Sequence, residues 1–403
     1  MKVISIGTDR KIFEEGSAVR ARMVEYASLF DELHIVVFVK RNFQFSTRPN
    51  GHSSGRIFNF QTISKIQIAG NCWVYPTNSL SRWFYIFDAI RIGKMVIKNL
   101  KFKIENSRND FVVSSQDPFE CGLAAYRLSR WAKIPLHLQI HVDFLSTYFK
   151  GQSFLNSVRV FMAKRILPKA DGIRVVSRRI KFSIETLNLK LKTSPAVLPI
   201  FTDVKKFAET APAFNLKQKY PQWNFIILVA ARFTAEKNIG FALRVLREVV
   251  RKYPKTGLVI VGSGPLKKNL QLATCNLQLT ENVVFENWQA DLVSYYKTAD
   301  LFLLTSLYEG FGLTLLEAVA SGCPSVSSDV GIAPELLRAG GRSFVCPVND
   351  LGCFTRKVLE FVEDNHLREF FRLEIAPAGV SAFEMSKGDY LKRYQSSIES
   401  SAR

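Results

Sequence analysis

The chain has 403 residues, of which 47% are hydrophobic and 22% charged. This composition excludes a chain that is disordered throughout, and the length exceeds what one hydrophobic core organises. The net charge is +20, and residues 1–200 carry +17 of it, with 31 Lys and Arg against 14 Asp and Glu. Such an excess suits an anionic membrane surface, an acidic acceptor or nucleic acid, with solubility charge as the alternative.

Short apolar strands alternate with amphipathic helices, starting directly after Met1. In the first half we predict strands at 3–7, 34–39, 111–114, 136–141, 173–176 and 196–199, and helices at 18–30, 82–100, 120–131, 154–166 and 178–187. Residues 41–64 are polar and rich in Ser and Gly, and we interpret them as a long irregular loop. No basic segment followed by an apolar one precedes the first strand, so we expect no secretory signal.

The same alternation starts again in the second half. We predict strands at 225–231, 257–261, 283–285, 301–304, 325–328 and 344–346, and helices at 240–252, 266–277, 292–299, 313–321 and 354–363. Strands and helices in this order predict parallel sheets covered by helices on both faces. The expected fold class is therefore α/β, with two doubly wound, Rossmann-like domains facing a cleft.

The periodicity breaks between residues 202 and 222, where prolines and a Lys-rich polar stretch occur. We therefore assign residues 1–203 to an N-terminal domain and residues 204–375 to a C-terminal domain. The six cysteines show no C-x-x-C pair and no metal-like spacing. We interpret them as isolated, buried thiols of a protein in a reducing compartment.

The segment EGFGLTLLE, from Glu309 to Glu317, follows the strand at 301–304 and opens the helix at 313–321. Glycines at such a turn allow the backbone to approach a ligand closely. The free amides at the start of the helix favour an anion. The two carboxylates suit two different parts of one extended ligand, and the alternative is a helix start with ordinary acidic residues.

This segment, continued by AVASGCP at 318–324, resembles the signature of retaining glycosyltransferases with the GT-B fold, the glycosyl transferases group 1 (family 4). The resemblance implies that Glu309 contacts the donor sugar and that Glu317 binds the ribose hydroxyls of the nucleotide. It also implies that the tail, residues 376–403, packs back on the N-terminal domain. The donor-binding residues expected in this segment are Gly310, Phe311, Gly312, Leu313 and Glu317.

A second segment, AARFTAEKN at 230–238, resembles the family's G-R-x-x-x-x-K segment, with Ala231 in place of the usual glycine. Arg232 offers a planar fork of donors and Lys237 a movable point charge, so together they suit a diphosphate. The resemblance implies that both stabilise the charge that develops on the leaving diphosphate, as a metal ion does elsewhere. Solvated surface charges are the alternative interpretation.

Glycine-containing turns follow two more strands of the second half. The segment VGSGP at 261–265 contains Gly262 and Gly264 and matches the family's V-G-x-G-P turn, which lies near the nucleotide. The segment DVGIAPE at 329–335 resembles the family's G-G-x-x-E loop, with Ile332 in place of one glycine. We assign no catalytic role to the glutamate of that loop.

The first half contributes weaker candidates. Gly16 stands where the family has a glycine-rich loop that touches the donor phosphate, and a simple turn residue is the alternative. His141 ends the strand at 136–141 and resembles the family's H-x-D/E segment, which implies a contact with the transferring sugar, whereas we interpret His137 as structural. The acceptor-side candidates are Arg20, Asp117, Glu120 and Asp143, and helix capping is the alternative for Asp117 and Glu120.

Two basic amphipathic stretches, 83–103 and 154–169, interleave aromatic residues with Lys and Arg. They suit an anionic lipid surface, and packing of an apolar face on a sheet is the alternative. We expect a cytoplasmic protein, in one version peripheral on the inner face of the cytoplasmic membrane, with a role in cell envelope polysaccharide biosynthesis. Nucleic acid is not expected as a partner.

These motifs together predict a glycosyltransferase that moves a hexose from a nucleotide-diphospho-sugar to a glycan or lipid-linked acceptor, with retention of anomeric configuration. No D-x-D motif is present, so we expect no metal and no cofactor besides the nucleotide-sugar substrate. The alternatives are a sugar-nucleotide epimerase of GT-B type and a non-catalytic protein that binds sugar nucleotides or glycans. A nicotinamide dehydrogenase is disfavoured because no G-x-G-x-x-G follows the first strand.

Overall fold

The computed structural model describes residues 1–41, 65–101, 110–339 and 341–402. They divide into two compact units. The first unit comprises Met1–Leu145, Lys150–Leu198 and Gly388–Arg403, and the second comprises Ser146–Phe149 and Pro199–Lys387. Apart from Arg41, the loop predicted at 41–64 lies outside the described residues.

The first unit is built on one eight-stranded sheet. Its strands are β1 (Lys2–Gly7), β2 (Glu32–Val37), β3 (Ile66–Ala69), β4 (Cys72–Pro76), β5 (Phe111–Ser115), β6 (Leu136–Ile140), β7 (Gly172–Val175) and β8 (Ala196–Val197). The order is β3-β4-β2-β1-β5-β6-β7-β8. Every pair is parallel except β3 with β4. All residues of β1, β5, β6 and β7 are buried, as expected for parallel strands covered on both faces.

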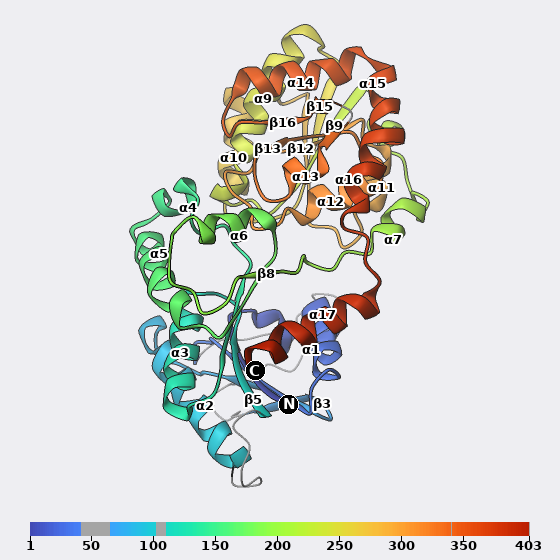
Figure 1. Cartoon of the computed structure of the whole chain (residues 1–403). Coiled ribbons are helices and arrows are strands. Elements are labelled where there is room, and N and C mark those ends of the chain that lie inside the picture. Colours follow the sequence, from blue (N-terminus) through green and yellow to red (C-terminus); the bar gives the residue numbers. More distant parts are fainter. Residues whose placement is uncertain (42–64, 102–109, 340, 403) are drawn as a thin grey trace. The chain divides into compact units, whose positions relative to one another are not determined.

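Helices cover both faces of this sheet. They are α1 (Ala18–Ala27), α2 (Tyr85–Lys101), α3 (Glu120–Ala132), α5 (Phe154–Ile166), α6 (Arg178–Glu185) and α17 (Lys387–Glu399), with short turns η1 (Arg10–Phe13), η2 (Arg82–Phe84), η4 (Leu167–Lys169) and η7 (Ser400–Ala402). Figure 1 shows α2, α3 and α5 on one face and α1 with α17 on the other. The short helix α4 (Thr147–Gly151) crosses the boundary between the units.

The C-terminal helix α17 is held in the first unit by a row of tyrosines. Tyr390 and Tyr394 are one helical turn apart and both buried. Tyr394 stacks on Tyr26 of α1 with 4.1 Å between ring centroids, and the hydroxyls of Tyr26 and Tyr390 are 3.0 Å apart. Beneath them, the buried Arg174 of β7 donates to the Tyr390 hydroxyl at 3.1 Å. Long-range contacts of this kind tie the end of the chain to the first sheet.

The second unit contains a six-stranded parallel sheet. Its strands are β9 (Phe225–Ala230), β10 (Thr256–Val261), β11 (Val283–Glu286), β12 (Leu301–Leu304), β13 (Ser325–Ser328) and β16 (Val345–Cys346), in the order β11-β10-β9-β12-β13-β16. A separate antiparallel pair is formed by β14 (Arg338–Ala339) and β15 (Arg342–Ser343). The strand order reverses between β9 and β12, which makes this the topological switch point where ligands bind in such sheets.

The helices of the second unit again lie on both faces of its sheet. They are α7 (Val204–Glu209), α8 (Leu216–Lys219), α9 (Ile239–Lys252), α10 (Lys267–Asn276), α11 (Val293–Thr298), α12 (Leu313–Ala320), α13 (Ala333–Leu336), α14 (Leu351–Glu363), α15 (Asn365–Phe370) and α16 (Ala376–Ser381), with η5 (Ala235–Lys237) and η6 (Phe371–Ile375). Helix α9 packs with α10 and α14, while α12 packs with α11 and α16.

The structure confirms the predicted α/β class with two Rossmann-like domains, and β12 and β13 coincide with their predicted ranges. The strands β3 and β4, which follow the polar segment 41–64, were not predicted. The tail assignment needs a correction, because residues 376–387 belong to the second unit. The reason is that α16 packs closely against α13 of the second unit. A Cβ on Gly379 of α16 would lie only 2.3 Å from the carbonyl oxygen of Leu336 in α13.

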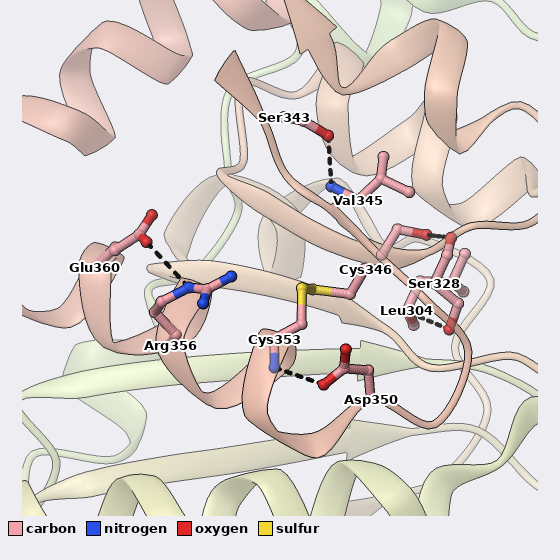
Figure 2. The surroundings of a disulfide bond; sticks show 10 residues. Leu304, Ser328, Ser343, Val345, Cys346, Asp350, Cys353, Arg356 and Glu360 are labelled. Atoms are coloured by element: carbon pink, nitrogen blue, oxygen red, sulfur yellow. Dashed lines mark hydrogen bonds and ion pairs between the residues drawn. A yellow bond between two sulfur atoms is a disulfide. The ribbon is translucent and has the colours of Figure 1, made fainter.

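The expectation of six isolated thiols is wrong for two cysteines. Cys346 in β16 and Cys353 in the first turn of α14 form a disulfide, with their Cα atoms 5.8 Å apart (Figure 2). Asp350 caps α14 by accepting a hydrogen bond from the Cys353 amide at 2.8 Å, which fixes the strand-to-helix turn. This turn brings two positions seven residues apart within disulfide range. A third cysteine, Cys275, is exposed, so it is not a buried thiol either.

Candidate active site

The loops that follow β9 and β12 are neighbours at the switch point of the second unit. After β12, the Leu307 amide donates to the Glu236 carbonyl at 2.8 Å. The Thr305 hydroxyl lies 3.2 Å from the carbonyl oxygen of Lys237. Because these contacts join the loops 231–238 and 305–312 directly, the two segments that carry the predicted cations and the predicted Glu309 form one continuous site.

Lys237 and Glu309 form the central pair of this site. The Lys237 Nζ lies 2.5 Å from the Glu309 Oε1, and the two side chains are only 16% and 13% exposed. The Ser306 hydroxyl donates to the same oxygen at 2.8 Å. The ammonium is held in a charge-assisted hydrogen bond and retains two further N–H donors.

Arg232 lies in the same loop but faces a different carboxylate. Its Nη2 is 3.3 Å from the Glu236 Oε1, and its side chain is 74% exposed. Glu236 also accepts a hydrogen bond of 2.6 Å from the Thr234 hydroxyl, which fixes the carboxylate. The Glu236 side chain is only 18% exposed, but the guanidinium itself is largely in solvent, so Arg232 can reorient toward a ligand at small cost.

Glycines allow the turn after β10 to lie against the loop after β9. A Cβ on Gly262 would lie 2.0 Å from the carbonyl oxygen of Ala231, and one on Gly264 would lie 2.6 Å from that of Phe233. The Phe233 amide also donates to the Ser263 carbonyl at 2.8 Å. The glycines of the VGSGP segment are therefore required by packing between the two loops, whatever contacts they make with a nucleotide.

The loop after β13 supports the segment that begins at Glu309. Gly331 has a φ of +52°, and a Cβ there would lie 2.1 Å from the carbonyl oxygen of Phe311. The Ile332 amide donates to that same oxygen at 2.9 Å. Gly312, with a φ of +102°, then begins α12 without a side-chain cap. The amides of Leu315 and Leu316 donate to the Gly312 carbonyl at 3.0 and 3.2 Å. Only the first amides of α12, those of Leu313 and Thr314, are therefore available to a ligand.

Glu317 lies one turn inside α12 and has a partner on a neighbouring helix. The Tyr296 hydroxyl of α11 donates to its Oε2 at 3.0 Å. Burial raises the pKa of the Glu317 carboxyl to about 7, and the Tyr296 hydrogen bond opposes this shift. The carboxyl group therefore changes its protonation state near neutral pH, which is unusual for a glutamate.

The candidates of the first unit occupy two kinds of environment. His141 follows β6 and part of its surface is exposed, whereas His137 is fully buried. The pKa of each histidine is lowered to about 3, first by desolvation and then by the charge of Arg174. His137 is thus neutral at physiological pH, as a structural histidine would be. Gly16 has a φ of +78°, a conformation that favours glycine in a turn.

The four acceptor-side candidates are engaged within the first unit or buried in it. Asp117 accepts a hydrogen bond of 2.7 Å from the Phe119 amide at the start of α3, and burial raises its pKa. Glu120 pairs with Arg159 of α5 at 2.9 Å. The remaining two are Arg20, 3.8 Å from Glu15, and the buried Asp143.

Among the described residues, no group of three or more His, Cys, Asp or Glu side chains could hold a metal ion. Within the same residues, no helix has the length and apolar character needed to cross a bilayer.

The sequence profile of the family described as Glycosyl transferases group 1 matches residues 214–373, all within the second unit. The second unit of the chain therefore matches this family. The match covers the four segments that follow β9, β10, β12 and β13, with the Lys237–Glu309 pair, and also Glu317 in α12. The residues that the resemblance singled out in the second half are therefore the ones that the fold gathers around one switch point.

Individual group 1 relatives show moderate similarity. Alpha-monoglucosyldiacylglycerol synthase of Streptococcus pneumoniae is 27% identical over an alignment covering 54% of this chain and 51% of that protein. The GDP-mannose-dependent alpha-(1-6)-phosphatidylinositol monomannoside mannosyltransferase of Mycolicibacterium smegmatis is 30% identical, with 53% and 58% covered. The chain thus spans little more than half the length of these curated relatives.

A solved structure extends the fold comparison to both units. The crystal structure of Anabaena Alr3699/HepE in complex with UDP and glucose matches with a TM-score of 0.71 at 17% identity. The match covers 99% of this chain and 100% of that chain. The fold of the chain is therefore GT-B.

Three polar partners in this candidate site were not predicted from the sequence. Ser306 precedes Glu309 by three residues and follows β12, so its position at a strand end was a usable signal. Tyr296 lies 21 residues before Glu317, on another helix, and no local pattern connects the two. Glu236 lies inside the cation segment, but its pairing with Arg232 was not foreseen.

Proposed function

We propose that this chain is a retaining glycosyltransferase that takes a hexose from a nucleotide-diphospho-sugar. The observation that carries the proposal is the partly buried Lys237–Glu309 pair, which lies at the switch point beside the uncapped start of α12. A cation, a carboxylate and free helix amides then lie together where a sheet of this topology binds its ligand. The match of residues 214–373 to the group 1 family and the fold similarity to a UDP-bound structure support the same conclusion.

In this proposal the second unit binds the donor. The two remaining N–H groups of Lys237, together with Arg232 after it leaves Glu236, bind the diphosphate. The Glu309 carboxylate accepts hydrogen bonds from sugar hydroxyls, and the backbone from Gly310 to Leu313 lies against the sugar. Glu317 accepts hydrogen bonds from the ribose hydroxyls, with Tyr296 holding the carboxylate in position.

The proposed transfer requires no covalent bond to the protein. The bond between the anomeric carbon and the diphosphate oxygen breaks, and the electron pair stays with the diphosphate. The acceptor hydroxyl oxygen bonds to the anomeric carbon from the same face, and its proton passes to the leaving diphosphate oxygen. Lys237 and Arg232 stabilise the negative charge as it develops on that oxygen. Retention of configuration follows from attack on the face that the leaving group vacates.

We assign the acceptor to the first unit, where His141 is exposed at the end of β6. Two relatives are named for transfer to a diacylglycerol-based and a phosphatidylinositol-based lipid. These names support a lipid-linked acceptor. A glycan acceptor is the alternative, and we further propose a place at the cytoplasmic side of a membrane, in cell envelope synthesis. We also propose that the reaction proceeds without a metal ion, because Lys237 and Arg232 provide the positive charge.

The proposal is tested first by thermal unfolding in the presence of UDP-, GDP- and ADP-sugars. One nucleotide-sugar is expected to raise the melting temperature, and Glu317→Gln and Arg232→Met should weaken that shift. The bound donor is then incubated with candidate lipid and glycan acceptors, with and without EDTA, and the anomeric configuration of the product is read by NMR.

The outcomes separate the alternatives. Transfer that survives EDTA and gives an α-linked product from an α-linked donor supports every part of the proposal. Conversion of the donor to an isomer without any acceptor would instead identify an epimerase. Donor binding with no conversion under any condition would identify a non-catalytic binding protein, and absence of binding to all three donor classes would refute the proposal.

A further inference from the structure

One helical layer of the first unit has an unusual outer surface. Helices α2, α3 and α5 lie side by side on one face of the sheet, with α3 in contact with both others (Figure 1). We call their solvent-facing side, together with η2, the layer surface. Its exposed large hydrophobic residues are Leu80, Trp83, Phe84, Phe87, Met95, Trp131, Phe154, Leu155, Val158 and Phe161. These are ten of the seventeen such residues in the described parts of the chain.

The exposure of individual side chains on this surface is high. Trp83 in η2 and Phe154 at the start of α5 are both 86% exposed, and Phe87 is 70% exposed. Along α2, Phe87, Arg91 and Met95 follow one another at four-residue spacing, so they form one row on the outside of the helix. Surface aromatics scattered singly need no explanation, but a row of them on one layer marks an interaction surface.

The same layer concentrates positive charge. Residues 80–100, 119–133 and 154–169 hold eleven Lys and Arg against two acidic residues, a net charge of +9 out of the chain's +20. Both acids are engaged locally: Asp88 accepts from the Ser79 hydroxyl at 2.6 Å, and Glu120 pairs with Arg159 at 2.9 Å. Asp88 also pairs with Arg91 at 3.3 Å, but the Arg91 side chain is 73% exposed. Most of the other cations of these segments are exposed as well.

Cations and aromatics alternate closely on α2. The residues Phe87, Ile90, Arg91, Lys94, Met95, Lys98 and Asn99 line an open groove of about 590 Å³. At its side, the Lys94 ammonium lies 5.0 Å from the ring centroid of Trp131 on α3. Long basic side chains that flank Trp and Phe allow the rings to enter the interfacial region of a bilayer while the charges reach lipid phosphates.

We infer that the layer surface binds the surface of an anionic lipid bilayer, with Trp83 and Phe87 entering the interface and Arg91 and Lys98 contacting phosphates. The positive charge of the layer surface is complementary to the negative charge of anionic lipid headgroups, which favours a bilayer as the partner. A second copy would present the same +9 surface in a symmetric contact and would be repelled. The inference is independent of the proposed transfer reaction, because it concerns a surface of the first unit and none of the donor residues.

The experiment is flotation of the full chain with vesicles. The vesicles contain either phosphatidylcholine alone or phosphatidylcholine with about 30% phosphatidylglycerol, at low and at high salt. We expect binding to the anionic vesicles at low salt and its loss at high salt. Because each basic residue near the surface changes partitioning about fivefold, Arg91→Gln with Lys98→Gln should weaken binding about 25-fold. Trp83→Ser with Phe87→Ser should weaken it by about tenfold or more.

A matched control uses the second unit. Lys268→Gln with Leu272→Ser on α10 removes one exposed cation and one exposed apolar side chain, and it should leave vesicle binding unchanged. Melting temperatures, and donor-induced shifts where a donor is known, verify that each variant is folded.

Three results would overturn the inference. The first is equal binding to neutral and anionic vesicles, or no binding to either. The second is a dimer in sedimentation velocity that the Trp83/Phe87 variant dissociates, which would assign the surface to a second copy. The third is binding of single-stranded nucleic acid, but not of vesicles, that the same variants abolish. A donor-induced thermal shift that persists in any of these cases would leave the proposed function standing.

Discussion

Replacement of Lys237 by Met tests whether the central ion pair serves catalysis or only the fold. The change removes the ammonium that lies 2.5 Å from Glu309, in a place where both side chains are about 85% covered. Loss of one partner from a buried ion pair costs about 3–5 kcal/mol. Here the Ser306 hydroxyl still donates to Glu309 at 2.8 Å, so we expect a loss of about 2 kcal/mol in the free energy of unfolding.

A second substitution separates the two roles. Glu309→Gln in the Lys237→Met background removes the uncompensated charge, so most of the lost stability should return. Catalysis should not return, because the leaving diphosphate still lacks its cation. From the size of comparable electrostatic contributions we expect kcat/KM to fall about 10²–10³-fold in Lys237→Met and to stay low in the double variant.

The assays are urea unfolding and initial rates of nucleoside diphosphate release. Lys252→Met serves as the control, since its ion pair with Glu363 is exposed and lies at the far end of α9. This control should change the free energy of unfolding by less than about 0.5 kcal/mol and leave the rate of nucleoside diphosphate release unchanged. Near-normal turnover in folded Lys237→Met protein would refute the catalytic role, and recovery of activity in the double variant would reduce Lys237 to a structural residue.

Further predictions concern a glycine, a carboxyl group and the disulfide. Gly331→Ala should lower the free energy of unfolding by about 2–4 kcal/mol and weaken donor binding. The alanine Cβ would overlap the Phe311 carbonyl oxygen, and the backbone there has a positive φ. Urea unfolding and thermal shift measure the two effects. The pKa of Glu317 is raised to about 7 in the folded state, so the free energy of unfolding should fall as pH rises from the unfolded pKa near 4.5 to about 7. The Glu317→Gln variant should lack this pH dependence, and an identical slope in the variant would contradict the assignment. Reduction of the Cys346–Cys353 bond should lower the free energy of unfolding by about 2 kcal/mol, the chain-entropy value for so short a loop, with Cys346→Ser/Cys353→Ser as the reagent-independent comparison.

The candidate residues of the site could be proposed from the sequence because they lie in short segments. Glu309 and Glu317 are eight residues apart with glycines between them, and Arg232 and Lys237 are five apart after a strand. Spacing within one loop or one helix turn is a local property, and glycine marks close backbone approach wherever it is needed. The hydrogen-bond partners of Glu317 and Glu309 could not be predicted from the sequence, because Tyr296 and Ser306 are brought to them by the packing of the fold.

The sequence by itself determined the α/β class, the division into two doubly wound halves and the place of most strands and helices, since hydrophobic periodicity is set by each element's own residues. Only the tertiary structure decided that Lys237 meets Glu309 across 72 residues, that Cys346 pairs with Cys353, and that α17 packs beneath Tyr26. These contacts depend on which strands are neighbours in a sheet. Strand order is fixed by the balance of packing over a whole unit, and no local pattern of residues encodes it.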